Sequence, residues 1–339
     1  MPTLAHGLLW IGFDGLDAGE VPELPVPGGL IPFSRNLDPD PERGPARLKA
    51  LLDGLQERWG GGLTLAVALD QEGGAVSRLR PWVGETPSLR QLWETQGAAG
   101  VEAWGRLWGE GLRLLGFNVD FAPVADLWDG HEGTGQGDRC ASRDPEAVAQ
   151  AAGAFLHGLE SMGVRGCLKH FPGLGGTRVD SHQALPEVLD HAQIEANVRP
   201  FVALGHLDRL AMVAHVRLPG SGEGPASLAR AFVAENPWGV RARFLPDDLE
   251  MGGCAAWPWD ERVRRCLEAG HEWLLVCQTE AGVRACAQAL EALPSSLWTP
   301  ALEAIRTLRR NLPLHQPGPL DQGAWADWVS RVQARSREA

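Results

Sequence analysis

The sequence lacks the features that place a protein in a membrane, in a secretion pathway or on nucleic acid. No run of apolar residues approaches the roughly 18 residues that a membrane span needs. The N-terminus has neither a basic region nor a long apolar stretch, so we expect no signal peptide. Basic residues are in deficit, with 31 Lys and Arg against 43 Asp and Glu and a formal net charge of −12. This charge argues against nucleic acid or an anionic membrane as the main partner.

Cysteine is sparse and scattered. The six cysteines include no Cys-x-x-Cys pair and no Cys/His pairs at the spacing of a zinc site. Cys167 and Cys277 lie in apolar runs that are typical of strands, where a reduced core thiol is the usual state. We therefore expect a protein of the reducing cytoplasm, and no metal ion or organic cofactor is implied.

Tyrosine is absent, whereas tryptophan occurs 14 times. This imbalance fits compositional drift in a sequence rich in Ala, Arg and Gly, and core packing accounts for most of the indoles. Trp257 and Trp259, in the segment Ala-Trp-Pro-Trp-Asp, have an alternative role, because exposed indoles stack on sugar faces. Packing is the favoured interpretation for both.

Short apolar runs alternate with longer amphipathic stretches along most of the chain. The runs are rich in Val, Leu, Ile and Phe and mostly unbroken by polar residues, as expected of strands buried on both faces. The predicted strands are Gly7–Phe13, Gly29–Phe33, Leu63–Leu69, Phe117–Phe121, Val164–Leu168, Leu210–Val216, Arg241–Leu245 and Trp273–Cys277. The predicted helices between them are Pro41–Trp59, Ser88–Leu115, Pro145–Met162, Asp190–Leu207, Ser227–Glu235, Asp260–Ala269 and Thr279–Leu293. Eight strands with intervening helices predict an α/β protein with a (β/α)8 TIM-type barrel.

A single domain accounts for the length, because 339 residues, 44% of them hydrophobic, can fill one large core. We assign residues 1–293 to the barrel. Residues 294–339 are too few for a second catalytic domain and are expected to form a helical extension packed on the barrel. Helical character covers Pro294–Asn311 and Asp321–Ser336, and the tail Arg331–Ala339 is expected to fray.

Polar residues recur where the predicted strands end, which is where barrel enzymes place their active sites. In strand order they are Asp70-Gln71-Glu72, Asp126, Lys169-His170, His215 and Asp247-Asp248. The turns at the opposite end of the predicted barrel carry nothing comparable. The recurrence predicts a polar pocket at the C-terminal end of the strands.

The loop from Lys169 to His182 is the most informative segment of the sequence. It follows a strand-like run and contains three glycines, which cost conformational entropy, together with polar side chains that do not suit a core. An Asp two residues before a His, as in Asp180-Ser181-His182, can fix the imidazole tautomer and raise its basicity. Such a pair suits a group that transfers protons.

Asp247 and Asp248 supply the other half of an acid/base couple. Adjacent strand residues point to opposite sides, so we expect at most one of them to face the barrel axis and the other to cap a helix or brace the site. A carboxylate together with a proton donor such as His182 is the minimum for cleaving a glycosidic bond with retention. Candidates for binding sugar hydroxyls are Asp70, Arg78, Arg139, Lys169 and His170.

Taken together, these motifs resemble glycoside hydrolase family 3, and in particular its single-domain β-N-acetylglucosaminidase branch, which acts in peptidoglycan recycling. The resemblance runs from about Gly7 to Val283, in the family's order. The motifs that carry it are Asp70-Gln71-Glu72-Gly73-Gly74 with Arg78, Phe121-Ala-Pro-Val, Asp138-Arg139, Lys169-His170-Phe171-Pro172-Gly173, Asp180-Ser181-His182 and Asp247-Asp248-Leu249.

The resemblance implies a role for individual residues. Asp247 aligns with the family's nucleophile, and His182 aligns with its acid/base, held by Asp180. The positions that match those binding the N-acetylglucosamine unit are Asp70, Arg78, Arg139, Lys169 and His170. We also expect Lys169 and Arg139 to lie near Asp247. The implied partner is a small glycan, a GlcNAc-β-1,4-anhydro-MurNAc muropeptide or disaccharide, and nothing in the sequence fixes the oligomeric state.

Two departures from the family pattern bear on rate and substrate choice. The family's loop usually reads Gly-His-Gly-Asp-Thr where this chain has Gly173-Leu174-Gly175-Gly176-Thr177. Pro246 stands where a serine usually precedes the nucleophile. Neither change removes a catalytic group. A histidine proton donor, unlike a carboxylate, does not repel incoming phosphate, so a glycoside phosphorylase stays open as an alternative, as does a β-glucosidase. Leu174 and Pro246 leave a sugar-binding pseudoenzyme as a further alternative.

Overall fold

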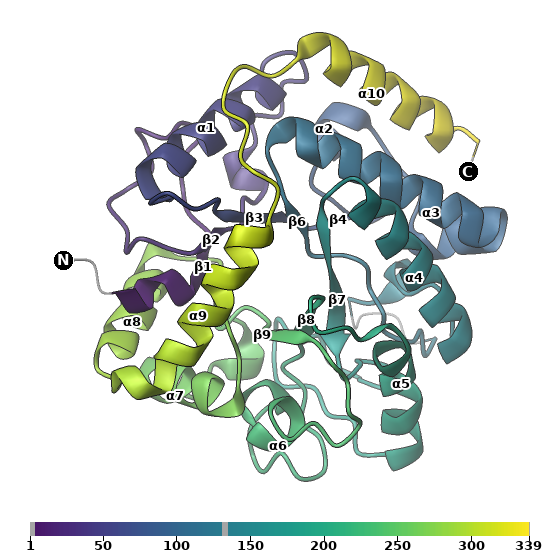
Figure 1. Ribbon diagram of the computed structural model, residues 1–339. Helices are drawn as coiled ribbons and strands as arrows, with labels where there is room; N and C mark the ends of the chain where they lie inside the picture. Colours follow the sequence, from purple (N-terminus) through teal and green to yellow (C-terminus); the bar gives the residue numbers. More distant parts are fainter. Residues whose placement is uncertain (1–3, 131–134, 339) are drawn as a thin grey trace.

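The centre of the computed structural model, which describes residues 4–130 and 135–338, is an eight-stranded sheet closed into a barrel (Figure 1). In order round the barrel, its strands are β1 (Leu9–Ile11), β2 (Gly29–Leu30), β3 (Ala66–Leu69), β6 (Val119–Asp120), β7 (Arg165–Phe171), β8 (Leu210–Val213), β9 (Arg243–Pro246) and β10 (Leu274–Val276). Neighbouring strands of this sheet pair in parallel, and β10 also pairs with β1. The ring closes where β9 meets β10, with Glu272 N donating to Phe244 O at 3.1 Å. Each strand overlaps one of the predicted runs, so the predicted barrel is confirmed.

Helices surround the barrel. They are, with 3₁₀ turns labelled η, η1 (Leu4–Leu8), η2 (Ser34–Asn36), α1 (Gly44–Trp59), α2 (Arg80–Val83), α3 (Leu89–Leu115), η3 (Gly137–Arg139), α4 (Pro145–Ser161), α5 (His191–Leu204), η4 (Ala226–Leu228), α6 (Arg230–Val233), η5 (Gly252–Cys254), α7 (Trp259–Ala269), α8 (Glu280–Glu291), α9 (Ser295–Asn311) and α10 (Gln322–Ser336). Each predicted amphipathic stretch overlaps one of the α-helices. Residues 12–28, all of them described, connect β1 to β2 without a helix.

Side-chain caps fix where several helices begin. The Asp144 carboxylate accepts from Glu146 N at the start of α4, where Pro145 occupies the first helical position, and Asp190 accepts from Ala192 N at the start of α5. Each cap satisfies a backbone N–H that has no partner within the helix. These caps place the helices, and thus the loops that precede them, at defined positions round the barrel.

Bulky aromatic side chains fill the interior of the barrel. Trp10, Phe121 and Trp273 are fully buried, and the Trp10 ring lies 4.6 Å from that of Trp273 and 4.9 Å from that of Phe121. The Trp10 indole donates to Leu30 O at 2.8 Å, so its one polar group is satisfied. The barrel is therefore a packed core, and a ligand can enter only at its end.

Trp257 and Trp259 are partly buried and pack against the same core. The Arg262 guanidinium lies 4.8 Å from the Trp259 ring. Neither indole lines the cavity described below. Packing, the favoured interpretation of these two residues, is what the structure shows.

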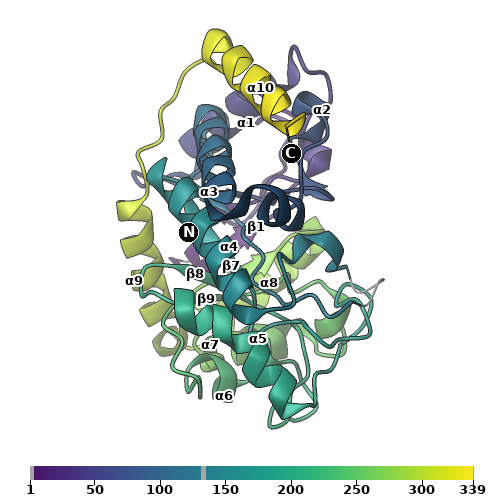
Figure 2. The ribbon, with the colours of Figure 1, turned by 90° about the vertical axis from the view of Figure 1, so that its right-hand side faces the viewer.

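The chain after residue 293 lies against the helices of the barrel (Figure 2). Arg309 of α9 donates to Thr64 O at 2.8 Å and to Gly60 O at 2.9 Å, and Trp328 of α10 donates to Leu107 O at 2.7 Å. The bonds to Gly60 and Thr64 anchor α9 at the turn before β3, and α10 runs along α3. We propose on this basis a barrel of residues 1–293 with a helical extension of residues 294–339.

The expectation that the tail frays from Arg331 is wrong, because α10 continues to Ser336. Arg331 forms an ion pair with Glu110 of α3, with Nη1 2.9 Å from Oε2, and Val332 is fully buried. These contacts hold the last turns of the helix to the barrel. Among the described residues, none of the helices has both the length and the hydrophobicity of a membrane span.

A short hairpin at the mouth of the barrel was not predicted. Strands β4 (Gln71–Gly73) and β5 (Val76–Ser77) pair antiparallel directly after β3. The buried Gln71 side chain holds the hairpin, donating to Ser77 Oγ at 2.9 Å and accepting from Leu79 N at 3.1 Å. The hairpin places Glu72 and Arg78 over the open end of the barrel.

Candidate active site

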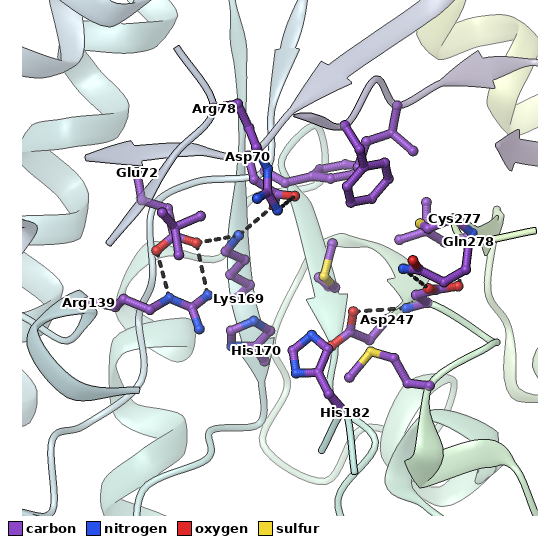
Figure 3. A pocket seen from close by; sticks show the side chains of 18 residues that line it. Asp70, Glu72, Arg78, Arg139, Lys169, His170, His182, Asp247, Cys277 and Gln278 are labelled. Atoms are coloured by element: carbon purple, nitrogen blue, oxygen red, sulfur yellow. Dashed lines mark hydrogen bonds and ion pairs between the residues drawn. The ribbon is translucent and has the colours of Figure 1, made fainter. Parts of the chain in front are cut away.

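A cavity of about 150 Å³ lies at the C-terminal end of the barrel strands (Figure 3). The candidates from the sequence that line it are Asp70, Arg78, Arg139, Lys169, His170, His182 and Asp247. The rest of its wall is formed by Ile31, Phe33, Glu72, Val76, Phe121, Met212, Asp248, Met251, Leu275, Cys277 and Gln278. Asp180 lies behind His182 and does not reach the cavity. The structure thus brings together the loops that follow six different strands.

One side of the cavity carries a cluster of charged side chains that share hydrogen bonds. The Lys169 ammonium lies 2.9 Å from Asp70 Oδ1 and 2.6 Å from Glu72 Oε1. Arg139 binds Glu72 with two parallel bonds, from Nε at 2.8 Å and from Nη2 at 2.9 Å. Arg78 lies at the edge of the cluster, with Nη2 3.5 Å from Asp70 Oδ2. The cluster is rigid because each group is held by at least one opposite charge.

The charges of this cluster are fixed at neutral pH. Burial alone would raise the pKa of Glu72, but the charges of Arg139 and Lys169 and the hydrogen bonds from both hold it well below its usual value. Burial would lower the pKa of Lys169, and the charges of Asp70 and Glu72 raise it above its usual value instead. The cluster therefore presents permanent donors and acceptors to a ligand rather than a group that titrates.

Glu72 is a member of this cluster that sequence reasoning missed as a site residue. It stands in the quoted motif, two residues after Asp70. Side chains two apart on an extended strand point to the same side, so the spacing itself could have placed Glu72 beside Asp70. Its cationic partners could not be found in this way, because Arg139 is 67 residues away in the sequence.

His170 lies between the charged cluster and the rest of the cavity. Its Nδ1 is 2.6 Å from Asp126 Oδ2, and its backbone N–H also donates to that carboxylate. Nε2 is thus the ring nitrogen that can meet a ligand. His215, the histidine that ends the next strand, is fully buried outside the cavity, where it bonds to Ser227 Oγ at 2.7 Å and to Asp248 O at 2.9 Å.

Asp247 and Asp248 have different surroundings on the opposite side of the cavity. Asp247 Oδ1 accepts from Asp248 N at 2.8 Å, and its side chain points into the cavity (Figure 3). Asp248 is buried and accepts from Glu250 N, Cys277 N and the Gln278 amide at 2.9–3.1 Å. Burial raises the pKa of Asp248 to about 6 despite these bonds.

Both aspartates line the cavity, and Asp247 is the one whose side chain points into it (Figure 3). Strand β9 ends at Pro246, so the alternation of a strand no longer applies to the residues that follow. The expected division of roles remains, because Asp248 braces the loop while Asp247 faces the space a ligand would occupy.

His182 enters the cavity from an exposed loop and is oriented by Asp180. Its Nδ1 lies 2.7 Å from Asp180 Oδ1, and the same oxygen accepts from His182 N at 2.9 Å. Partial burial would raise the pKa of Asp180, but the hydrogen bonds from the His182 backbone and ring lower it below its usual value. Asp180 is therefore an anion that fixes Nδ1–H, which leaves Nε2 for proton transfer.

Comparisons with known proteins identify the family of this chain. The sequence model of the glycosyl hydrolase family 3 N-terminal domain matches residues 21–305. The chain belongs to glycoside hydrolase family 3. A β-hexosaminidase of Tolumonas auensis is 34% identical over 288 residues, which cover 82% of this chain and 83% of that relative. A β-hexosaminidase of Methylococcus capsulatus is 32% identical over 324 residues, 91% of this chain and 92% of the relative.

Solved structures of the family show the same fold. The NagZ protein of Neisseria gonorrhoeae, in complex with N-trifluoroacetyl-D-glucosamine, is 26% identical with a TM-score of 0.78, and the match covers 100% of this chain and 99% of that one. A family 3 β-N-acetylglucosaminidase from Paenibacillus is 27% identical with a TM-score of 0.82, covering 99% of this chain and 68% of that one.

Lys169 and Arg139 do not accompany Asp247 as the sequence led us to expect for this family 3 chain. Both hydrogen-bond to the acids of the charged cluster, and Figure 3 shows Arg139 and Glu72 across the cavity from Asp247. Both cations form ion pairs with Glu72, which was not among the predicted site residues. The Asp247 carboxylate instead accepts a hydrogen bond from the backbone N–H of Asp248.

The residues that depart from the family 3 loop pattern are held by hydrogen bonds from or to their backbone. Leu174, which replaces a histidine, is buried in a small apolar cluster, and its N–H donates to Asp126 at 2.8 Å. Gly176 N donates to Asp129 Oδ2 at 2.8 Å, and Asn197 donates to Gly175 O at the same distance. The loop before Asp180 is thus held by its backbone, so the two replaced side chains are not needed to support it.

No three or more His, Cys, Asp or Glu side chains in the described ranges converge as ligands for a metal ion. The acids of the site instead bond to cations or to N–H groups. Cys277 lines the cavity but is almost fully buried, and burial raises the pKa of its thiol well above the usual value.

The loop bearing His182 rests directly on the loop that follows Asp247. Gly252 N donates to His182 O at 3.3 Å, and Gly253 N donates to Ser181 O at 3.2 Å. A Cβ atom on Gly252 would lie 2.5 Å from Gln183 O and 2.9 Å from His182 O, so only glycine allows this approach.

We expect Gly252→Ala to push the His182 loop away from Asp247. The rate of hydrolysis should fall at least tenfold, because a displacement of about 1 Å at a reacting group can cost about 10²-fold. The melting temperature should change little, since the His182 loop is exposed. Steady-state kinetics with thermal unfolding would test this, with Gly19→Ala as control because a Cβ there meets no atom within 4 Å. A rate equal to that of wild type would contradict the expected displacement.

Proposed function

We propose that this family 3 protein is a retaining exo-β-N-acetylglucosaminidase. Asp247 is the nucleophile, and His182, held by Asp180, is the acid/base. The residues that bind the terminal sugar are Asp70, Arg78, Arg139, Lys169 and His170. The observation that carries the proposal is the shared cavity, which the carboxylate of Asp247 and the imidazole of His182 enter from one side, opposite a cluster of fixed charges (Figure 3).

In the first step, an oxygen of Asp247 attacks the anomeric carbon. The bond from that carbon to the leaving oxygen breaks, its electron pair goes to this oxygen, and the oxygen takes the proton from His182 Nε2. In the second step, His182 Nε2 removes a proton from water, the water oxygen attacks the anomeric carbon, and the ester to Asp247 breaks. The configuration is inverted twice and so retained. Imidazole is the side chain that most often serves as both general acid and general base near neutral pH, which suits both proton transfers.

The charged cluster suits the hydroxyls at the far end of the sugar ring. Lys169 uses two of its N–H groups on Asp70 and Glu72, which leaves a third for a ligand. Asp70 Oδ2 and His170 Nε2 add positions for hydrogen bonds. Because these groups are rigidly held and pre-ordered, they bind a polyhydroxylated ring without first losing conformational entropy.

For the natural substrate, we propose peptidoglycan fragments of the GlcNAc-β-1,4-anhydro-MurNAc type, hydrolysed in the cytoplasm. The relatives named β-hexosaminidase, and the NagZ structure bound to N-trifluoroacetyl-D-glucosamine, support a sugar with an N-acyl group. The six cysteines, all within the described residues, are buried without forming disulfides, which agrees with a reducing compartment.

An assay of the purified protein tests the proposed activity. We expect release of nitrophenol from nitrophenyl N-acetyl-β-glucosaminide, less from the glucoside, and no stimulation by phosphate. Faster turnover with phosphate and formation of a sugar 1-phosphate would instead identify a phosphorylase. A preference for the glucoside would identify a β-glucosidase, and binding without turnover a pseudoenzyme.

We expect His182→Ala to affect substrates according to their leaving groups. A disaccharide with a sugar alcohol as leaving group needs the proton from Nε2, so its kcat/KM should fall about 10²–10⁴-fold, the usual size of general acid catalysis. An aryl glycoside leaves without full protonation and should lose less in the first step. Parallel kinetics on a chitobiose-type disaccharide and on a nitrophenyl glycoside would show the difference. Equal losses in the glycosylation step would contradict the role of general acid.

A further inference from the structure

Gln278 is a polar residue of the cavity that the mechanism above does not use. It lies two residues after the end of β10, and its amide end points into the cavity on the side of Asp247 (Figure 3). Its backbone N–H donates to Glu250 Oε2 at 2.6 Å, and its Nε2 donates to Asp248 Oδ2 at 2.9 Å. Both bonds fix the residue to the loop that carries the proposed nucleophile.

The bond to Asp248 fixes which way round the Gln278 amide lies. An ionised carboxylate can only accept hydrogen bonds, and the other oxygen of Asp248 already accepts from the backbone N–H groups of Glu250 and Cys277. Gln278 must therefore turn its NH₂ group toward Asp248. Its Oε1 is left as an acceptor, and no group in residues 4–130 or 135–338 is seen to donate to it.

The position of this acceptor follows from the proposed role of Asp247. If Asp247 attacks C1 of the sugar, C2 is the carbon bonded to the attacked atom, so the substituent on C2 lies near Asp247. The other polar side chains on this side of the cavity have their own roles, since His182 serves the leaving oxygen and Asp248 already accepts three hydrogen bonds from its own loop and from β10's end. The ring oxygen, which is the other neighbour of C1, only accepts hydrogen bonds and would be repelled by Oε1.

We infer that Gln278 is a specificity-determining residue whose Oε1 accepts a hydrogen bond from the N–H of an acetamido group at C2 of the sugar. Met251, Leu275 and Cys277 line the same cavity and supply apolar contacts for the acetyl methyl group. Gln278 is exposed, so this bond forms in competition with water, and its loss costs what an ordinary hydrogen bond contributes, up to about tenfold in affinity. A C2 hydroxyl can rotate to another partner and depends less on Gln278. The inference rests on the proposed function of Asp247.

Two variants test the inference by different routes. Gln278→Leu removes the acceptor at similar size. Asp248→Asn reverses the amide, because the new NH₂ group donates to Gln278 Oε1 and the Gln278 NH₂ group then faces the acetamido N–H. Gln288→Leu, at an exposed position of α8, is the matched control.

The measurements are kcat/KM for nitrophenyl N-acetyl-β-glucosaminide and for the β-glucoside, and calorimetric binding of N-acetylglucosamine and of glucose. We expect both variants to lose about tenfold on the N-acetylated sugar, the size of one unmet hydrogen bond. Loss on the glucose compounds should stay within about twofold, and the control should match wild type. Equal losses on both sugars, or an unchanged preference, would overturn the inference.

The failure of the proposed hydrolase and the failure of this inference give different results. If wild type hydrolyses neither glycoside but binds N-acetylglucosamine better than glucose, and Gln278→Leu abolishes that preference, the hydrolase fails and the role of Gln278 stands. If wild type hydrolyses the N-acetylglucosaminide and Gln278→Leu keeps the wild-type preference, the hydrolase stands and the role of Gln278 fails.

Discussion

Asp247→Asn is expected to lower kcat by at least about 10⁴-fold, the size of loss seen when one member of a catalytic unit is removed. The amide has nearly the shape of the carboxylate, and its oxygen can still accept the 2.8 Å bond from Asp248 N. What it loses is the negative charge that attacks the anomeric carbon. The binding of N-acetylglucosamine should persist, since the charged cluster lies across the cavity. Single-turnover kinetics, which separate bond cleavage from binding, would measure the loss.

Asp248→Asn is the matched control for this variant, because the two aspartates are neighbours in the same loop. An asparagine at 248 can keep the bonds from Glu250 N and Cys277 N, and it can bond to Gln278 if that amide turns round. We expect a loss within about tenfold, that of one hydrogen bond. Comparable losses for the two variants would contradict the assignment of Asp247 as the nucleophile.

The stability of the Asp248→Asn variant gives a second readout. Burial raises the pKa of Asp248 in the folded state to about 6 from its ordinary value of 3.8. The folded state therefore binds more protons than the unfolded state between these values, and ionisation of Asp248 reduces stability as the pH rises through this window. The asparagine lacks this cost, so the variant should melt no lower than wild type at pH 7.

Glu72→Gln is expected to have the largest effect on stability. It leaves the buried cations Lys169 and Arg139 without their shared anion and turns an NH₂ group toward their donors. Removing one partner of a buried ion pair costs about 3–5 kcal/mol of unfolding free energy. Glu110→Gln, which breaks a half-exposed pair with Arg331, should cost no more than about 1 kcal/mol and serves as control. Equal denaturation midpoints for Glu72→Gln and wild type would contradict the account of the cluster.

The acid dependence of stability should also differ between Glu72→Gln and wild type. The pKa of Glu72 is lowered in the folded state, so its contribution is complete above the unfolded value near 4.3 and is lost as the pH falls toward the folded value. The glutamine variant lacks this loss. Urea titrations at pH 7 and at pH 3 should show a smaller fall in stability for the variant than for wild type.

The barrel could be predicted from the sequence because strands buried on both faces carry unbroken apolar runs. Most predicted runs are longer than the strands, since a run reflects burial while a strand is defined by pairing. Gly7–Phe13 shows this, because Gly7 and Leu8 belong to η1 and only Leu9–Ile11 pairs as β1. Strand β7 instead extends beyond its predicted run, to Phe171. The β4–β5 hairpin was missed because its residues are polar or small, although Gln71, Glu72 and Gly73 are buried.

The sequence could predict which residues meet in the candidate site, but not which of them pair with one another. Polar residues at the ends of the predicted strands are the ones that meet at one end of the barrel. The spacing of Asp180 and His182 predicted that the aspartate orients the imidazole, and the two side chains are hydrogen-bonded at 2.7 Å. Which cation pairs with which acid depends on distances across the barrel, so Lys169 and Arg139 were placed beside Asp247 rather than Glu72. Gln278 carried no signal, because one amide after a strand is ordinary until its partner Asp248 is known.

The central claim is that the sugar becomes attached to Asp247 during the reaction. The direct measurement is intact-protein mass spectrometry after incubation with a fluorinated N-acetylglucosaminyl fluoride that slows hydrolysis of the ester, followed by peptide mapping. We expect one added glycosyl group per chain, located on the peptide that contains Asp247, with no adduct on the Asp247→Asn variant. An adduct on another residue, or turnover without any adduct, would contradict the account.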